Sequence, residues 1–147
     1  MVWKCDTCGD AVETVETGWV EWMSQIGSKS TNPRHNFRLV HHAVPGKKCQ
    51  YNSRTFPEGT GLGDLPLAYF LGNDGLMNLL EYLSDSPSSA DEIIELIKRL
   101  HIPGYEEARS HFDHAIRAGV FEPNTKPGFY SLADIQRTVD WAKKLSD

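Results

Sequence analysis

The sequence has no run of about twenty apolar residues, so we expect no membrane-spanning helix. It also has few cysteines, namely Cys5, Cys8 and Cys49. Three thiols cannot all pair within one chain, and the residues from Met1 to Cys5 do not begin like a secretory signal peptide. We therefore expect a cytoplasmic protein in a reducing compartment, where thiols more often bind metals than form disulfides.

Acidic side chains are missing from residues 23–57, although the whole chain has a formal net charge of −5. The cations of this segment are Lys29, Arg34, Arg38, Lys47, Lys48 and Arg54. Residues 61–87 have the opposite composition, with acids and no Lys or Arg. A basic segment that also has aromatic side chains can contact nucleic acid, so residues 29–54 are a candidate surface for it. The net negative charge opposes such binding at long range, and we expect these cations to act mainly as solubilising charge.

The cysteines lie in a pattern typical of a zinc site. Cys5 and Cys8 form a Cys-x-x-Cys pair followed by Gly9, which favours a tight turn that directs two thiolates at one point. Either His41 or His42, together with Cys49, completes a set of three cysteines and one histidine. We predict a zinc ion bound by four ligands, Cys5, Cys8, His41 and Cys49.

The choice of His41 over His42 rests on strand alternation. Between Phe37 and His42 the side chains are expected to alternate between the two faces of a strand. His41 then shares a face with Phe37 and Leu39, whose large apolar side chains should face a small core. His42 stays the alternative ligand, because strands twist and bulge near their ends.

Residues 1–56 are predicted to form a zinc-binding β-ribbon module. The β-prone run around Trp19 and Trp22 is expected to pair antiparallel with residues 37–42, and loop-forming residues from Ser24 to His35 predict a hairpin tip. This organisation resembles a zinc ribbon. The resemblance implies β-hairpins that a metal ion stabilises because their own core is small.

A glycine-rich stretch, residues 57–66, is predicted to link this module to the rest of the chain. It superficially resembles a phosphate-binding loop. However, it has no lysine, and Asp64 places the wrong charge next to a phosphate. We therefore expect no nucleotide site in this stretch.

Residues 67–147 are predicted to be helical. Asn73 or Asp74 is expected to cap a helix that leucines and Met77 nearly surround, so this helix is predicted to be central and buried. The capping-box pattern from Ser89 to Glu92 begins the next helix, which has a stripe of isoleucines and leucine. A third amphipathic helix is expected to follow and to end at Gly119.

Short β-prone pairs, Val120-Phe121 and Phe129-Tyr130, flank a loop rich in Pro, Asn and Gly and predict a hairpin, and Ser131 is expected to cap a last helix. This order of elements resembles a winged helix-turn-helix. The resemblance implies a module that binds DNA or protein. The candidate reading helix begins with acids, Glu106 and Glu107, which are unfavourable next to phosphates, so protein binding is preferred.

We therefore expect an α+β fold, with a small zinc-stabilised antiparallel β-ribbon packed with a helical, winged-helix-like C-terminal half. The expected function is that of a non-enzymatic zinc-binding interaction or regulatory protein. A protein partner is preferred over nucleic acid.

A different class of protein shares part of the cysteine and histidine pattern. The Cys-x-x-Cys pair, His41-His42 before Pro45, and Cys49 resemble part of an HNH endonuclease motif. The resemblance implies that His42 is a general base and that His41 lies near a catalytic divalent ion. That family also has a second Cys-x-x-Cys and a later Asn and His, whereas this chain has no histidine between residues 42 and 101. A nuclease is therefore the less favoured alternative.

Overall fold

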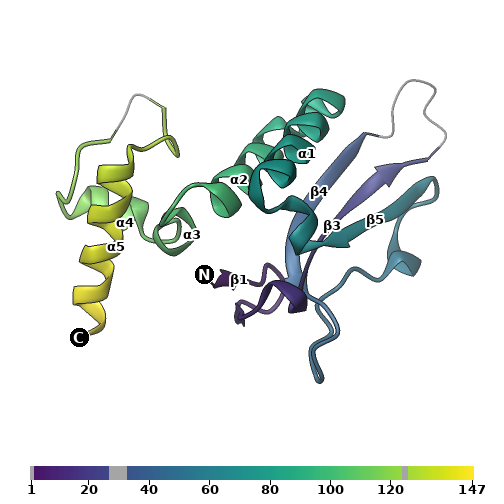
Figure 1. Cartoon of the computed structure of the whole chain (residues 1–147), viewed down its shortest axis with the longest axis horizontal. Coiled ribbons are helices and arrows are strands. Elements are labelled where there is room, and N and C mark those ends of the chain that lie inside the picture. Colours follow the sequence, from purple (N-terminus) through teal and green to yellow (C-terminus); the bar gives the residue numbers. More distant parts are fainter. Residues whose placement is uncertain (1, 27–32, 124–125) are drawn as a thin grey trace. The chain divides into compact units, whose positions relative to one another are not determined.

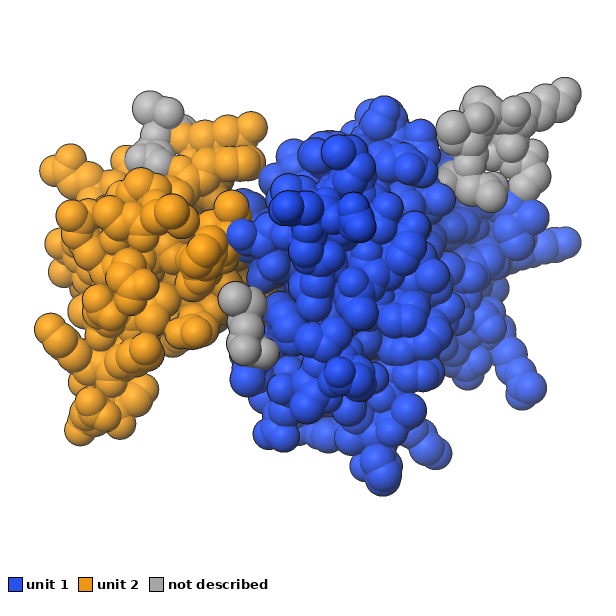
Figure 2. All heavy atoms as spheres, viewed as in Figure 1, with its two compact units in different colours: residues 1–101 blue, residues 102–147 orange. Residues whose placement is uncertain are grey.

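The computed structural model describes residues 2–26, 33–123 and 126–147 (Figure 1). Within them the protein is a mixed α+β structure with small antiparallel sheets and five α-helices. The chain divides into two compact units, residues 1–101 and 102–147 (Figure 2), and each unit has its own hydrophobic core. No helix of the described ranges is long and apolar enough to cross a bilayer.

The larger sheet of the first unit has the strand order β4-β3-β5 and is antiparallel throughout. Strand β3 (Gly18–Gln25) is central, between β4 (Arg34–His41) and β5 (Thr60–Pro66). The predicted pairing of the tryptophan run with residues 37–42 is confirmed, since Trp19 lies opposite Val40. The predicted hairpin tip falls largely on residues 27–32, which include Lys29 and lie outside the described residues.

One face of this sheet forms the core of the first unit. Val20 and Trp22 point to this face, where the Trp22 ring contacts Phe70 and Tyr82 with ring centroids 6.3 and 5.5 Å apart. A second, two-stranded sheet contains β1 (Trp3–Lys4) and β2 (Ala11–Val12). Trp3 and Val12 are buried in the same core, so both sheets share one hydrophobic interior.

Strand β5 occupies most of the glycine-rich stretch. Gly63 lies opposite Trp22, and a Cβ at this position would collide with the indole ring. Gly61 is covered in the same way by Ile26, whose Cδ1 would be 2.9 Å from an added Cβ. The glycines therefore make room for large side chains of the neighbouring chain segment. Residues 60–66 belong to the sheet, whereas their glycine content predicts a linker.

The helices of the first unit follow β5. The 3-10 turn η3 (Leu67–Phe70) leads to α1 (Gly72–Asp85), and a second turn, η4 (Pro87–Ser89), leads to α2 (Ala90–His101). Helices α1 and α2 contact each other (Figure 1).

The prediction that α1 is central and buried holds for only one side of the helix. The helix buries Gly75, Leu79 and Tyr82, but Met77 and Leu80 are 66% and 43% exposed. The apolar arc of this helix extends past the side that faces the core. Its outer part therefore reaches the surface, which hydrophobicity alone does not reveal.

Side chains from the α1–α2 region bond the outer edge of β4. Ser86 Oγ accepts a hydrogen bond from Arg34 N at 3.2 Å, and Ser89 Oγ donates to Arg34 O at 2.6 Å. Glu92 Oε1 accepts from Phe37 N at 2.8 Å. The predicted capping-box pattern therefore marks the start of α2 correctly, while its two key side chains bond a neighbouring strand.

The second unit contains α3 (Tyr105–Ala108), α4 (Phe112–Arg117) and α5 (Leu132–Ser146). The predicted third helix is thus two short helices. Ser131 caps α5 as predicted, with its side chain accepting a hydrogen bond from Asp134 N at 3.2 Å.

The predicted hairpin between α4 and α5 contains no strand in its described parts, residues 118–123 and 126–131. The rings of Phe121 and Tyr130 lie 5.1 Å apart between centroids, and both contact Phe112. Aromatic packing brings these residues together without a strand ladder. A wing of the winged-helix type is therefore not found in the described part of this segment.

Candidate metal centre

Three cysteines and one histidine converge in the first unit. One ligand atom from each of Cys5, Cys8, His41 and Cys49 lies within 4.8 Å of the others. Among the described residues, no other group of three or more His, Cys, Asp or Glu side chains lies close enough together to hold a metal ion. Cys8 is exposed and the other three side chains are buried. The structure thus brings together the four residues proposed from the sequence.

Cys5 and Cys8 lie in the turn between β1 and β2. Gly9 N donates to Cys5 O at 3.0 Å, and Cys5 N donates to Asp10 O at 2.9 Å. These bonds close the turn. Gly9 has a φ of 81°, which is the left-handed conformation that the sequence pattern predicts. We refer to residues 5–9 as the knuckle.

His41, the last residue of β4, has its two ring nitrogens in different surroundings. Nδ1 is 3.5 Å from Cys8 Sγ and 3.7 Å from Cys49 Sγ, whereas Nε2 is 2.9 Å from Ala11 O. A carbonyl can only accept, so Nε2 donates to Ala11 O, and in the neutral ring Nδ1 is then the nitrogen whose lone pair faces the sulfurs. The hydrogen bond between Nε2 and Ala11 O fixes the orientation of the ring, as is usual for histidines that bind a metal through the other nitrogen.

His42 lies outside the group of ligands. Its ring packs on Trp19 with centroids 4.1 Å apart, and its backbone N–H donates to Thr17 O at 2.8 Å. Its Nδ1 is buried without a hydrogen-bond partner among the described residues. The change of direction from His41, the last residue of β4, to His42, the residue after it, therefore separates the two histidines, one toward the sulfurs and one toward an indole ring.

The thiols differ in acidity. Burial is the largest influence on Cys5 and opposes its ionisation, but backbone N–H groups of Cys8, His41 and Thr7 lower its pKa to about 6. Burial, followed by hydrogen bonds with Cys5 and Cys8 and their negative charge, raises the pKa of Cys49 to about 12. A divalent cation supplies the positive charge that all three thiolates need, so the donor set fits a thiophilic metal ion.

Lys47 is the cation next to the sulfurs. Its Nζ lies 3.7 Å from Cys8 Sγ and pairs with the Asp10 carboxylate. A divalent ion with three thiolates and a neutral imidazole has a net negative charge, which a nearby ammonium group partly offsets. At least one cation of the basic segment thus has a local role at the centre.

The backbone of Cys49 is held by two side chains that sequence reasoning missed. Its carbonyl accepts from Thr7 Oγ1 at 2.6 Å and from Arg38 Nη2 at 3.1 Å. Arg38 Nε also donates to Glu21 Oε1 at 2.7 Å, and Glu21 is fully buried. The Glu21–Arg38 pair lies at directly opposite positions of β3 and β4, so only the strand register would have revealed it.

Asp6 attaches the knuckle to β4. Its Oδ2 accepts from Leu39 N at 2.8 Å, and its own N–H donates to Leu39 O at 2.8 Å. Arg99 of α2 in turn contacts Asp6 and donates to Lys4 O at 2.9 Å. The sequence gives no signal for this contact, because Asp6 and Arg99 lie in elements far apart along the chain.

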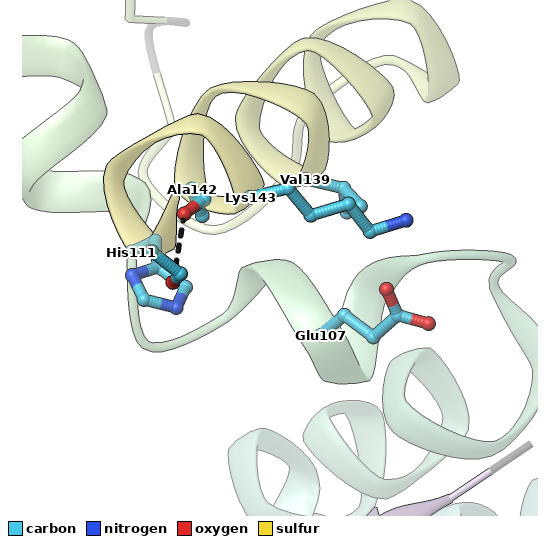
Figure 3. Close-up of a pocket in the computed structure, with 6 residues that line it drawn as sticks. Glu107, His111, Val139, Ala142 and Lys143 are labelled. Carbon is cyan, nitrogen blue, oxygen red and sulfur yellow. Dashed lines mark hydrogen bonds between the residues drawn. The ribbon is translucent and has the colours of Figure 1, made fainter.

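Hollows of the described surface include one at the metal centre and one in the second unit. One of about 340 Å³ adjoins His41 and Lys47 of the metal centre and is also lined by Asp10, Glu13, Thr14 and Thr17. The other, of about 170 Å³, lies between α3 and α5 of the second unit (Figure 3) and is lined by Glu107, His111, Val139, Ala142, Lys143 and Ser146. The second hollow does not bring together three potential metal ligands among the described residues.

No protein-family model matches the chain, and no curated protein or solved structure is significantly similar to it. The functional interpretation therefore depends on the geometry of the chain itself.

Proposed function

We propose that this chain is a non-enzymatic, zinc-stabilised interaction protein that binds a protein partner. The observation that carries the proposal is the complete ligand set of Cys5, Cys8, His41 and Cys49. Catalytic zinc sites have three protein ligands and one position open to water or substrate, whereas structural sites have four. A zinc ion here would use all four ligands and hold the knuckle, the end of β4 and the segment at Cys49 together.

The exposed face of α1 supports a protein as the partner. Met77 and Leu80 are 66% and 43% exposed and lie three positions apart on one side of the helix. Exposed apolar side chains grouped on one element are typical of protein-binding surfaces. The flexible Met77 side chain also suits an interface that adapts to its partner.

The basic segment supports nucleic acid less well. Arg38 pairs with Glu21, and Lys47 pairs with Asp10. Arg34 Cζ lies 4.0 Å from the centroid of the Tyr82 ring. These cations are already used within the chain, so fewer remain for phosphates. The placement of His42 on Trp19 also disfavours the nuclease alternative, which requires His42 beside water and a catalytic ion.

Affinity capture from a lysate tests the proposal. We expect the immobilised chain to capture a partner that resists nuclease treatment and is lost with the double variant Met77→Glu/Leu80→Glu. Leu145→Glu is a matched control, because Leu145 is an exposed leucine of the second unit, 60% exposed. Capture that disappears with nuclease, or that the α1 variant leaves intact, would contradict the proposal for this surface.

A further inference from the structure

The two edges of the three-stranded sheet differ in their hydrogen bonding. At the β4 edge, the backbone groups of Arg34, Phe37 and Leu39 bond side chains or backbone of the knuckle, the α1–α2 turn and α2. Strand β5 forms the opposite margin (Figure 1), and it pairs with β3 alone among the described strands. One edge is therefore closed and the other is open to a further strand.

Strand alternation identifies which backbone groups β5 presents. Hydrogen-bonding groups of successive residues point to opposite sides of a strand. Leu39 bonds outward from β4, so Val20 opposite it points its backbone groups toward β5, where it lies opposite Leu65. Leu65 therefore points its own backbone groups toward β3. By alternation, the N–H and C=O groups of Asp64 and Leu62 point outward, away from β3. Neither residue has an outward hydrogen bond to the part of the chain that the structure describes.

Between Leu62 and Asp64 the open edge lacks most of the usual features that prevent strand addition. Edge strands are commonly protected by lysines and other charged residues, prolines, bulges or a covering segment. Strand β5 has no Lys or Arg, and its register with β3 has no shift. Its proline, Pro66, is the last residue of the strand and limits the open edge to the residues before it. Leu62 is also 37% exposed, so an apolar side chain accompanies the free backbone groups.

The charges along one row of the sheet specify the partner. Arg38, Glu21 and Asp64 lie at opposite positions on β4, β3 and β5. Arg38 neutralises Glu21 at 2.7 Å, while Asp64 has no cation within ion-pair distance among the described residues. Like charges at opposite positions are unfavourable, so a cation at the next position outward would stabilise this row. The next row of side chains on the same face of the sheet contains Met23 and Leu62 and favours an apolar neighbour.

We propose that the free edge of β5 binds an extended peptide segment of a partner protein as an antiparallel fourth strand. The segment has a basic residue opposite Asp64 and, two positions further along, an apolar residue opposite Leu62. Main-chain hydrogen bonds supply affinity, and the alternate side chains supply specificity. A second copy of β5 fits less well, because this strand provides no basic residue to face Asp64. This site is separate from the exposed face of α1, and neither requires the other.

Peptide binding to the full zinc-loaded chain tests the inference. The probe is a short fluorescent peptide, acetylated and amidated, with a central Arg-Thr-Val in a Thr-rich β-prone background, and fluorescence anisotropy is the measurement. We expect saturable binding that weakens about five-fold when Glu replaces the arginine, as a cross-strand ion pair predicts. Asp64→Lys should reverse this preference, and the zinc content of the variant verifies that the fold persists.

A matched pair of peptides tests strand addition without changing the protein. N-methyl groups on the amides that face β5 should abolish binding, and the same number of N-methyl groups on the outward amides should not. Equal binding of both peptides, absence of binding by the parent peptide, or no response to Asp64→Lys would overturn the inference. The Met77→Glu/Leu80→Glu variant should bind the peptide normally, so failure of the α1 interface is distinguishable from failure at β5.

Discussion

Arg99 Nη1 lies 3.0 and 2.8 Å from the two carboxylate oxygens of Asp6. Arg99 is only 3% exposed, so its charge needs partners within the chain, and the partly exposed Asp6 carboxylate is one of them. Because Asp6 also bonds Leu39, one carboxylate joins the knuckle, β4 and α2. The geometry of the metal centre is therefore supported by a helix that contributes no ligand.

Asp6→Ala should destabilise the protein strongly. It removes a carboxylate partner of the buried Arg99 and the acceptor of Leu39 N, which should cost about 1 to 3 kcal/mol. Urea unfolding of the zinc-loaded chain gives the change. Arg137→Ala is the control, because Arg137 pairs with Asp134 at the surface, has a side chain 59% exposed and should lose under about 1 kcal/mol. Equal effects of the two variants would show that the Asp6–Arg99 pair does not support the centre.

The purified chain should contain about one zinc ion, and the two adjacent histidines should respond differently to substitution. His41→Ala removes a ligand and should release the metal. His42→Ala removes a ring that packs on Trp19 and should keep it. Elemental analysis of protein prepared without chelator measures both. A folded wild-type protein without zinc, or equal loss in both variants, would contradict the assignment.

Zinc binding should release more protons in mild acid than at neutral pH. Above its pKa of about 6 Cys5 is mostly ionised, whereas Cys49, with a pKa of about 12, must lose a proton to bind. Below the Cys5 pKa that thiol must lose one as well, so zinc affinity falls more steeply as pH decreases. Calorimetry in buffers of different ionisation enthalpy, at about pH 7.5 and about pH 5.5, counts the protons. The same count at both values would refute this order of acidities.

Gly63→Ala should destabilise the sheet by about 1 to 3 kcal/mol, because the new methyl group overlaps the Trp22 ring. The double variant Gly63→Ala/Trp22→Leu removes that ring and should show a smaller cost than the sum of the two single variants. Thermal or urea unfolding of all three variants measures the coupling. Additive costs would mean that Trp22 does not require the glycine.

The parts of the structure that short-range patterns determine could be predicted from the sequence. The Cys-x-x-Cys turn has its left-handed Gly9, the change of direction at the end of β4 separates His41 from His42, and Ser131 caps its helix. Each of these depends on neighbours within a few residues. A local pattern is sufficient in such cases because backbone geometry alone fixes the outcome.

The remaining features depend on contacts that local patterns do not contain. Strand β5 was hidden because its glycines accommodate Trp22 and Ile26, which belong to another part of the chain. Met77 marks a helix face as apolar without showing that the core ends before it. The support that Arg99 gives to Asp6 spans 93 positions, so no periodicity or spacing indicates it.

The closed edge of β4 has a consequence for folding during synthesis. The metal ligands are complete once Cys49 has left the ribosome, but the edge of β4 is covered by Ser86, Ser89 and Glu92, which emerge later. Until then the nascent chain exposes an unpaired strand edge, which is prone to pair with other chains. The N-terminal ribbon should therefore aggregate more when it is produced alone than when the chain continues through α2, which closes the β4 edge and leaves only the β5 edge open.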